Sequence, residues 1–383
     1  MKSDIEGSLN IQIAVDENNG NIVSIESTRP VHVSRLFEGK TAAEVLALLP
    51  VVFNVCAAAQ SCAGVRACEQ ALDQPAEEST EQLRTALVRM EALREHLWRI
   101  LLDWAEFVGT PVNEQALTEI AGLEREYRQA LCADIDPFEL GSLAEKTDSN
   151  ILKSIAHKFR DLLHQDVFAM HPEQWLAIDD QDALFAWADS SGTIAARLIS
   201  KVRQHGWENQ GACHIDALPA LTDDEIHQLL QDREFVRLPQ LDGRCCETSS
   251  LSRSQSRLLD VLLNAHGNGL LSRLVARLTE IACLASQLIP EEETEIPAYS
   301  RYDDAGIGQA AAARGQLIHR VNLEGNRIVR YQILAPTEWN FHPRGVVAQA
   351  LASLRGGADE IELQARLLIN AIDPCVGYEL QLK

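Results

Sequence analysis

Two short regions, one near each end of the chain, alternate apolar and polar residues. Apolar side chains recur at about every second position over 9–15 and again over 22–25, with Asp, Asn and Gly between them. The same alternation runs over 317–323 and returns over 328–334 after a Gly-Asn pair. A period of two on both sides of such a turn is typical of a β-hairpin. The pattern therefore predicts two small hairpins.

Between the hairpins, apolar residues recur with the spacing of an amphipathic helix, most clearly over 78–107. Thr41, followed three residues later by Glu44, is a capping-box sequence and predicts a helix start. Small residues dominate 56–72, which suits a helix that packs closely on its neighbours or leaves room for a ligand. Residues 205–250 show little periodicity and are expected to form a surface loop region. Further helices are expected over 114–132, 141–165, 192–204, 222–232, 252–289, 345–354 and 360–372.

These elements predict a mainly α protein with small β-hairpins, an α+β fold whose middle is a helix bundle. A chain of 383 residues can form one large domain or two ordinary ones. We expect a single domain over 1–383. Its N-terminal part, 1–72, holds the first hairpin, its helical middle is 73–290, and its C-terminal part, 291–383, holds the second hairpin.

Charge and composition exclude several classes of function. The formal net charge is -22, whereas a nucleic-acid groove or an anionic membrane surface requires basic residues. No apolar run approaches the roughly 20 residues that cross a bilayer, and the N-terminus lacks the apolar region of a signal peptide. Nine cysteines without an export signal are typical of cytosolic thiols rather than disulfides. We therefore expect a cytoplasmic protein with neither nucleic-acid nor membrane partners.

Two cysteines are the candidate metal ligands. Cys375 follows Asp-Pro after a long helical stretch, a setting that looks like half of a metal site. Cys56, far away in the sequence, is the candidate for the other half. If the two thiols meet, the first and last parts of the chain close around one ion or cluster. The alternative is that both are buried thiols without a ligand, as cysteines often are.

Other thiols and imidazoles are interpreted as structural residues. Cys62 lies six residues beyond the first candidate ligand, about 240° around a helix, so it should face another way. We interpret Cys68 as a packing residue as well, and Cys245-Cys246 as ordinary thiols. His319, on a predicted strand, is expected to be structural, and His342 is interpreted as an exposed loop residue.

A series of short motifs occurs in a fixed order near both ends of the chain. They are Ile5-Glu6-Gly7, Phe53-Asn54-Val55-Cys56, Arg66-Ala67, Arg314-Gly315, His319, Tyr331-Gln332, Pro336-Thr337, Trp339-Asn340, Pro343-Arg344 and Asp373-Pro374-Cys375. In order and spacing this series resembles the large subunit of nickel–iron hydrogenases. The resemblance implies the helix-bundle fold of that subunit, while the middle of the chain agrees only in being helical.

The departures from that family concern its metal ligands. The enzymes hold nickel and iron with four cysteines, whereas Phe53 and Tyr378 stand at two of those positions here. Gln60 and Gln381 replace two histidines, and Ser34 falls about where the family has a metal-binding glutamate. The resemblance therefore implies that the nickel and magnesium sites are lost, because nickel in that family needs four soft thiolates. The sequence ends two residues beyond Gln381, so we expect no C-terminal tail for a nickel-dependent protease.

What the resemblance retains is the pocket for the diatomic ligands of the iron. In the family, the arginine that matches Arg314 lies over two cyanides, and the hydroxyl that matches Thr337 hydrogen-bonds one of them. Guanidinium and hydroxyl groups are donors, and cyanide nitrogens are acceptors. Glu6 matches a proton-relay glutamate and is expected to hydrogen-bond Cys56. An apolar wall for carbon monoxide is expected from Leu334, Ala335 and Pro336.

Loss of the nickel site with retention of the iron pocket resembles the HupK/HoxV group of hydrogenase-like auxiliary proteins. This resemblance implies a maturation scaffold rather than an enzyme. The scaffold would bind iron as Fe(CN)2(CO) and help its assembly or its transfer to the hydrogenase large subunit. Implied partners are a HypC/HoxL-type iron chaperone, a HypD-type assembly protein and the immature large subunit. Two alternatives stay open: a cofactor-free partner of the maturation machinery and a degenerate redox enzyme.

Overall fold

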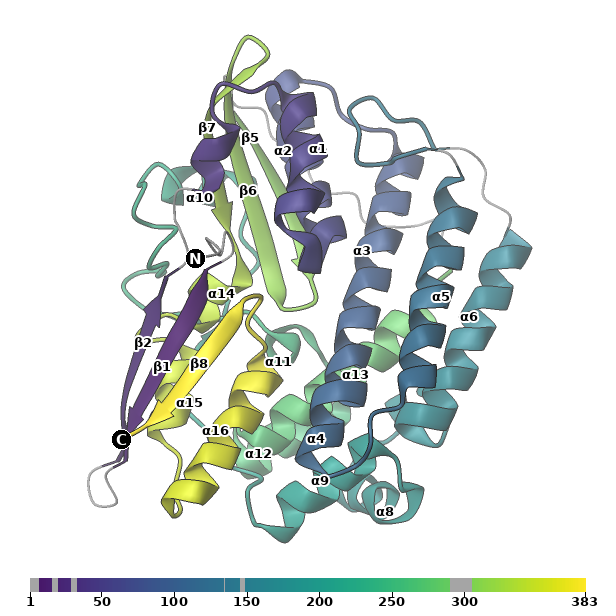
Figure 1. Ribbon diagram of the computed structural model, residues 1–383, viewed down its shortest axis with the longest axis vertical. Helices are drawn as coiled ribbons and strands as arrows, with labels where there is room; N and C mark the ends of the chain where they lie inside the picture. Colours follow the sequence, from purple (N-terminus) through teal and green to yellow (C-terminus); the bar gives the residue numbers. More distant parts are fainter. Residues whose placement is uncertain (1–6, 16–19, 29–32, 134, 145–148, 290–304) are drawn as a thin grey trace.

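The computed structural model shows a helical body with two small three-stranded sheets along one side (Figure 1). The structure describes all residues except 1–6, 16–19, 29–32, 134, 145–148 and 290–304. Helices dominate, the two larger sheets come from the two ends of the chain, and a short pair of strands, β3 (Asp216–Ala217) and β4 (Cys246–Glu247), lies between them, which confirms the predicted α+β class.

The first sheet joins the two ends of the described chain. β1 (Ser8–Ala14) pairs antiparallel with β2 (Ile22–Ser27), which confirms the first predicted hairpin. Most of its turn, 16–19, lies outside the described residues. β8 (Gly377–Leu382) pairs parallel with the other edge of β1, so the strand order is β2-β1-β8. This third strand was not predicted, because its partner lies at the opposite end of the chain.

The second sheet contains the second predicted hairpin and one further strand. β6 (Gly315–Glu324) and β7 (Arg327–Leu334) pair antiparallel and confirm the hairpin. β5 (Ala305–Ala312) pairs with the free edge of β6, which gives the order β5-β6-β7. This additional strand was not predicted, because it consists mainly of Ala and Gly, residues that are poor signals for a strand.

Small residues allow this second sheet to pack directly on the helix α2 (Ala57–Leu72) (Figure 1). A Cβ atom at Gly308 would overlap the carbonyl oxygen of Ala63, and one at Gly306 would overlap that of Ala67. The backbone of β5 can therefore approach the helix only without a side chain at these positions. Of the two explanations for the small residues of α2, the structure favours close packing over room for a ligand.

The predicted helices are present, most with ends shifted by a few residues, but the one expected over 141–165 is wrong at its start, since 141–144 are not helical and α6 runs over Ser149–Leu163. The capping box is confirmed, since Glu44 N–H donates to the Thr41 hydroxyl and the Thr41 N–H donates to the Glu44 carboxylate. The prediction over 78–107 corresponds to α3 (Glu78–Trp98), a π-helical stretch (Arg99–Trp104) and α4 (Ala105–Phe107). The others are α1 (Ala42–Val52), α5 (Glu114–Cys132), α6 (Ser149–Leu163), α9 (Ile194–Gln204), α10 (Asp223–Leu229), α11 (Ser250–Arg253), α12 (Arg257–His266), α13 (Leu270–Ser286), α14 (Pro336–Asn340), α15 (Val346–Ala352) and α16 (Ala358–Ile372). Two further helices, α7 (Pro172–Leu176) and α8 (Gln181–Ser191), were not predicted.

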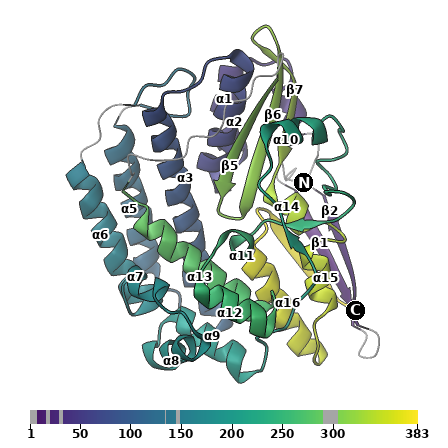
Figure 2. The same ribbon diagram turned by 180° about the vertical axis from the view of Figure 1, so that it is seen from behind.

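The helices α3, α5 and α6 stand side by side on the side of α2 that faces away from the sheets (Figure 1). Seen from behind, α13 crosses α3 (Figure 2). The sheet β2-β1-β8 lies next to α15 and α16. No single helix in the described ranges is long and apolar enough to span a membrane; α1 and the segment Asn54–Leu72 reach that length only together, and they meet at a bend of 98°.

The surface loop region expected over 205–250 is wrong in its last part. Glu247 is buried and forms an ion pair with the buried Arg273. Thr248 is also buried, and its backbone N–H and C=O both bond the side chain of Asn340. Polar residues can be buried when they have polar partners. Because those partners lie far along the chain, the polar composition of this stretch gave no sign of its burial.

Candidate metal-binding site

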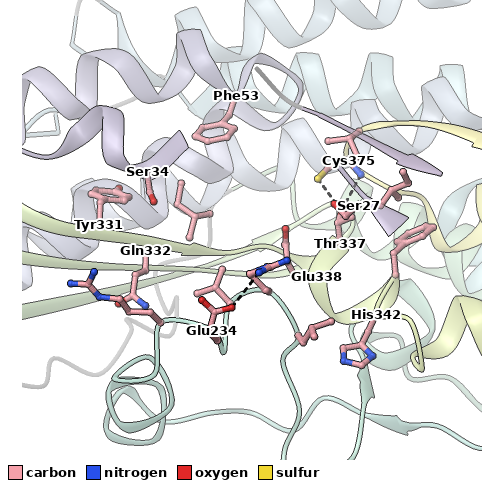
Figure 3. Close-up of a pocket in the computed structure, with 18 of the residues that line it drawn as sticks. Ser27, Ser34, Phe53, Glu234, Tyr331, Gln332, Thr337, Glu338, His342 and Cys375 are labelled. Atoms are coloured by element: carbon pink, nitrogen blue, oxygen red, sulfur yellow. Dashed lines mark hydrogen bonds and ion pairs between the residues drawn. The ribbon is translucent and has the colours of Figure 1, made fainter. Parts of the chain in front are cut away.

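A cavity of about 650 Å³ lies between the two sheets and α14, and both candidate thiols, Cys56 and Cys375, line it. Figure 3 shows Cys375 beside Thr337 at one end of the cavity, away from Tyr331 and Gln332. The two cysteines come from opposite ends of the sequence. The structure thus brings together the two halves of the site that the sequence analysis expected to meet.

Cys56 is placed by the sharp bend between two helices. It ends a short 3₁₀ turn (Asn54–Cys56) that connects α1 with α2. The carboxylate of the buried Glu91 accepts the N–H groups of Ala58 and Ala59, at 2.7 and 3.0 Å, and so caps the first turn of α2. The thiol is partly exposed to the cavity. Burial of the thiol raises the pKa of Cys56 to about 12, and the negative charges of the nearby Cys375 and Glu91 act in the same direction.

Cys375 is placed by an abrupt helix end. Asp373, with φ 64° and ψ 95°, terminates α16, and Pro374 follows. The Asp373 carboxylate lies 3.1 Å from Arg99 Nε and 3.4 Å from Arg314 Nε, which holds this unusual backbone conformation. Cys375 N–H donates to the Thr337 hydroxyl at 3.2 Å, and the same hydroxyl lies 2.9 Å from Cys375 Sγ. The sulfur is therefore fixed from its own backbone and from α14.

Arg314 is buried, and it is not among the residues that line the cavity. Its Nη2 donates to Glu95 at 2.9 Å and its Nε donates to the carbonyl of Pro374 at 3.2 Å. Burial by itself would lower the pKa of Arg314, but the charges of Asp373 and Glu95 raise it well above its usual value. The guanidinium is therefore always charged, and its charge favours the thiolate form of Cys56.

Three further side chains connect to Cys56 through hydrogen bonds. Gln60 Nε2 lies 3.6 Å from Cys56 Sγ, and Gln60 Oε1 lies 2.8 Å from His319 Nε2. His319 Nδ1 lies 2.8 Å from the Tyr331 hydroxyl. All three side chains are buried, and burial lowers the pKa of His319 to about 3. The sequence predicts only a structural role for His319 and none for Gln60 or Tyr331, because the three residues lie far apart or carry no local signal.

The apolar wall of the cavity differs from the expected one. Leu334, Ala335 and Pro336 are buried, but they are not among the lining residues. Apolar lining near the thiols comes instead from residues on the bend after α1, the turn after α14 and the segment before β8. These residues are Phe53, Val55, Phe341 and Val376.

The remaining candidates are placed as follows. Ser34 lines the cavity, and Glu6 lies outside the described residues. Cys62 and Cys68 are buried in α2, away from the lining. The interpretation of His342 as an exposed residue is wrong, since its side chain is buried. Its ring lies 3.2 Å from Cys245 Sγ and 3.1 Å from Gln240 Nε2, and these partners exclude it from solvent.

In the part of the chain that the structure describes, no group of three or more His, Cys, Asp or Glu side chains could hold a metal ion. The site therefore offers two thiols, Cys56 and Cys375, with a hydrogen-bonding group on each sulfur. A tetrahedral or four-thiolate centre requires more ligands than this. Two soft thiols suit a metal that already carries other ligands.

The fold and the C-terminal motifs match known hydrogenases. A sequence profile of the nickel-dependent hydrogenase family matches residues 233–377. The nickel–iron–selenium hydrogenase from Desulfomicrobium baculatum has a similar structure, with a TM-score of 0.67, 14% identity and 97% of each chain covered. The chain thus has the fold of a nickel–iron hydrogenase large subunit.

Relatives that match over nearly the full length of the chain have more specific names than the hydrogenase family as a whole. The hydrogenase expression/formation protein HupK of Azotobacter vinelandii is 29% identical over 98% of both chains. HupK of Bradyrhizobium diazoefficiens is 30% identical over 94% of this chain and 92% of the relative. The chain belongs to the HupK/HoxV family of hydrogenase expression/formation proteins. This confirms the family that the sequence motifs predicted.

Proposed function

We propose that this protein is a hydrogenase maturation scaffold, which binds the Fe(CN)2(CO) unit at Cys56 and Cys375. It would help assemble the unit or pass it to the nickel–iron hydrogenase large subunit. The observation that carries the proposal is the meeting of two thiols from opposite ends of the chain at one cavity. The names of its relatives, hydrogenase expression/formation proteins, support a role in maturation. In this role the chain binds and releases a cargo and does not catalyse a reaction.

The ligand set supports this cargo. Two thiolates are soft ligands that suit low-spin iron. Together with two cyanides and one carbon monoxide, Cys56 and Cys375 would give the iron five ligands. A sixth position would stay open for a water or for a thiol of the next protein. Nickel in the enzymes needs four thiolates, and the described residues of this site supply two.

The size of the cavity is sufficient for the cargo. The iron unit has seven non-hydrogen atoms, and at about 30 Å³ for each, the share of a liquid water molecule, it occupies roughly 200 Å³. The cavity measures about 650 Å³. The cargo would therefore fit at the thiol end and leave room for a partner's ligand to enter from the other end.

The surroundings of the thiols support binding of an electron-rich unit. Arg314 would stabilise the thiolates and cyanides through its charge, without lining the cavity. Carbon monoxide would lie against the apolar side chains of Phe53 and Val376. Thr337 would support the ligand sulfur of Cys375.

Partners follow from this role. The iron unit would come from a HypC/HoxL-type chaperone working with a HypD-type assembly protein, and its recipient would be the immature large subunit. Cargo passed between proteins requires interfaces that form and separate, and such transient interfaces are small or modest in area. Such a transfer would need the partner to reach the thiols through this cavity.

Infrared spectroscopy on protein purified without oxygen, from cells that contain all maturation factors, tests the proposal. Metal-bound cyanide and carbonyl groups absorb in a window where proteins absorb little. We expect bands from both ligands, iron in the metal analysis and no nickel. Cys56→Ala and Cys375→Ala should lose the bands. Cys283→Ala is the matched control, because this partly exposed thiol on α13 does not line the cavity.

Three results would contradict the proposal. If wild-type protein carries no such bands but still binds the maturation proteins, the cofactor-free alternative is correct. If Cys375→Ala keeps the bands, Cys375 is not a ligand. Hydrogen-dependent dye reduction by the purified protein would instead favour the redox-enzyme alternative.

A further inference from the structure

We infer that Tyr331, His319 and Gln60 form a positioning relay that holds an amide N–H on the sulfur of Cys56. Each member comes from a different element: Tyr331 from β7, His319 from β6 and Gln60 from α2. The links are 2.8, 2.8 and 3.6 Å long and lead from the phenol to the sulfur. The relay is independent of Thr337, which contacts the other thiol.

The orientation of the Gln60 amide, with Nε2 toward Cys56 and Oε1 toward His319, sets the direction of the relay. His319 is fully buried in an apolar setting, so its imidazole is neutral and has one donor and one acceptor nitrogen. Gln60 Oε1 can only accept a hydrogen bond, so His319 Nε2 must carry the hydrogen. His319 Nδ1 is then the acceptor, and the Tyr331 hydroxyl donates to it. This leaves Gln60 Nε2 as the donor to Cys56 Sγ.

The opposite direction is chemically possible and has a different meaning for Cys56. If His319 carried its hydrogen on Nδ1, Nε2 would accept from the Gln60 amide. The amide would then be turned around, and Oε1 would face Cys56 as an acceptor for an S–H group. A thiol can donate such a bond, whereas a thiolate or a metal-bound sulfur can only accept. The direction found here therefore favours Cys56 as a metal-ligand sulfur.

The packing around the relay leaves it little freedom. The Tyr331 ring lies edge-on against Phe37, with ring centres 5.0 Å apart. A Cβ atom at Gly64 would lie 3.1 Å from the Tyr331 hydroxyl and would overlap the side chain of Leu49, so a larger residue there would displace Leu49 and press on Tyr331. Gln60 and Tyr331 both line the cavity, yet both are almost inaccessible to solvent. Hydrogen bonds in such a buried setting are stronger than in water, because little water can compete for the donors and acceptors.

Nitrogen-15 NMR of the imidazole gives the first test, on wild-type protein without iron. The two neutral tautomers of histidine have distinct nitrogen shifts. We expect His319 to carry its hydrogen on Nε2, and to keep this state down to pH 5. The Nδ1–H tautomer in the wild-type protein would overturn the proposal, because the relay would then run toward Tyr331. A charged imidazole at pH 7 would also overturn it.

Site-resolved alkylation gives the second test. Iodoacetamide is added at pH 7.5, and mass spectrometry of peptides gives separate rates for Cys56 and Cys375 in one sample. Loss of a donor that shifts a thiol by one pKa unit should slow alkylation about threefold, because tenfold less thiolate is partly offset by its higher nucleophilicity. We expect Tyr331→Phe and Gln60→Met to slow Cys56 about threefold relative to Cys375. Thr337→Val should slow Cys375 and leave Cys56 unchanged.

The alkylation rate of Cys375 serves as an internal reference. It shows whether the relay residues act on Cys56 alone or only support the structure of the cavity. Variants that merely loosen the cavity would change both rates together, and that result would overturn the proposal, as would no change in either. If Tyr331→Phe does not fold, Gln60→Met and the wild-type tautomer still decide it. The value of the relay for holding iron rests on the proposed function. Neither experiment uses iron, so the relay and the iron scaffold can fail separately.

Discussion

The hydroxyl of Thr337 serves both the backbone and the sulfur of Cys375, although the two residues belong to different elements. It accepts the Cys375 N–H at 3.2 Å and lies 2.9 Å from Sγ. Toward a thiolate, only the hydroxyl can donate, and it has a single hydrogen. While the hydroxyl donates this hydrogen to the sulfur, it cannot also donate it to a cyanide nitrogen. In this protein, Thr337 would therefore act on an iron unit through its sulfur ligand.

Replacement of Thr337 tests these two hydrogen bonds of its hydroxyl. Thr337→Val keeps the shape of the side chain but leaves the Cys375 N–H without an acceptor. An unsatisfied buried donor costs about 1–3 kcal/mol, so the free energy of unfolding in urea should fall by that amount. Thr337→Ser retains the hydroxyl and should stay closer to the wild type. Equal stability of the Val variant and the wild type would show that the bond contributes nothing.

Close packing between β5 and α2 makes Gly308 irreplaceable. An Ala side chain there would overlap the carbonyl of Ala63, and backbone atoms can move only if the sheet moves. We expect Gly308→Ala to reduce the free energy of unfolding by about 3 kcal/mol. The matched control is Gly122→Ala on α5, where a Cβ atom meets nothing within 4 Å and helix propensity should add about 1 kcal/mol. A small effect of Gly308→Ala in urea unfolding would contradict this account of the packing.

Arg84 is the centre of a buried ion network. Its guanidinium is fully buried and contacts Glu69 at 2.7 Å and Glu81 at 2.6 Å. Arg84→Met removes the cation that Glu69 and Glu81 share, while Glu81 keeps its ion pair with Arg66 at 2.6 Å. Breaking a buried ion network in this way should cost about 3–5 kcal/mol. Arg203→Met breaks the exposed pair with Asp189 and should change the stability by less than about 1 kcal/mol. Thermal and urea unfolding of both variants would show whether the difference is real.

Glu91 makes the stability depend on pH near neutrality. Burial raises the pKa of Glu91 to about 7 in the folded protein, although the N–H groups of Ala58 and Ala59, which bond the carboxylate, lower it in part. The pKa of the same group in the unfolded chain is near 4.5. Between these values the folded state binds the extra proton, so stability falls as pH rises through this window. The loss from pH 5 to pH 8 should be about 3 kcal/mol. Glu91→Gln should remove that part of the pH dependence in urea unfolding; an unchanged slope would refute the assignment.

Local sequence signals predicted local structure well. The capping box at Thr41 and Glu44 was correct because both partners lie within one helical turn. The two hairpins were correct because each strand lies next to its partner in the sequence. β5 was missed because its Ala and Gly residues serve the close contact with α2, which no local pattern shows.

The site was predictable only in part. Cys56 and Cys375 were selected by motifs that resemble a known family, since no spacing rule connects two residues so far apart. The relay through Gln60 and His319 could not be predicted, because its members come from three elements that meet only in the folded chain. His342 was misjudged because its burial depends on Cys245, in a stretch that has no periodic pattern.

The parallel pairing of β1 with β8 has a consequence for biosynthesis. Ser8 aligns with Gly377 in this pairing, so the contact spans almost the whole sequence. Contacts between residues so far apart in the sequence form slowly, because the loop that they close is very long. A ribosome also delivers β8 after every other element of the site has left the exit tunnel. The complete sheet β2-β1-β8, and with it the segment before β8 that carries Cys375, therefore assembles late in folding, after β1, β7 and α14 are already available.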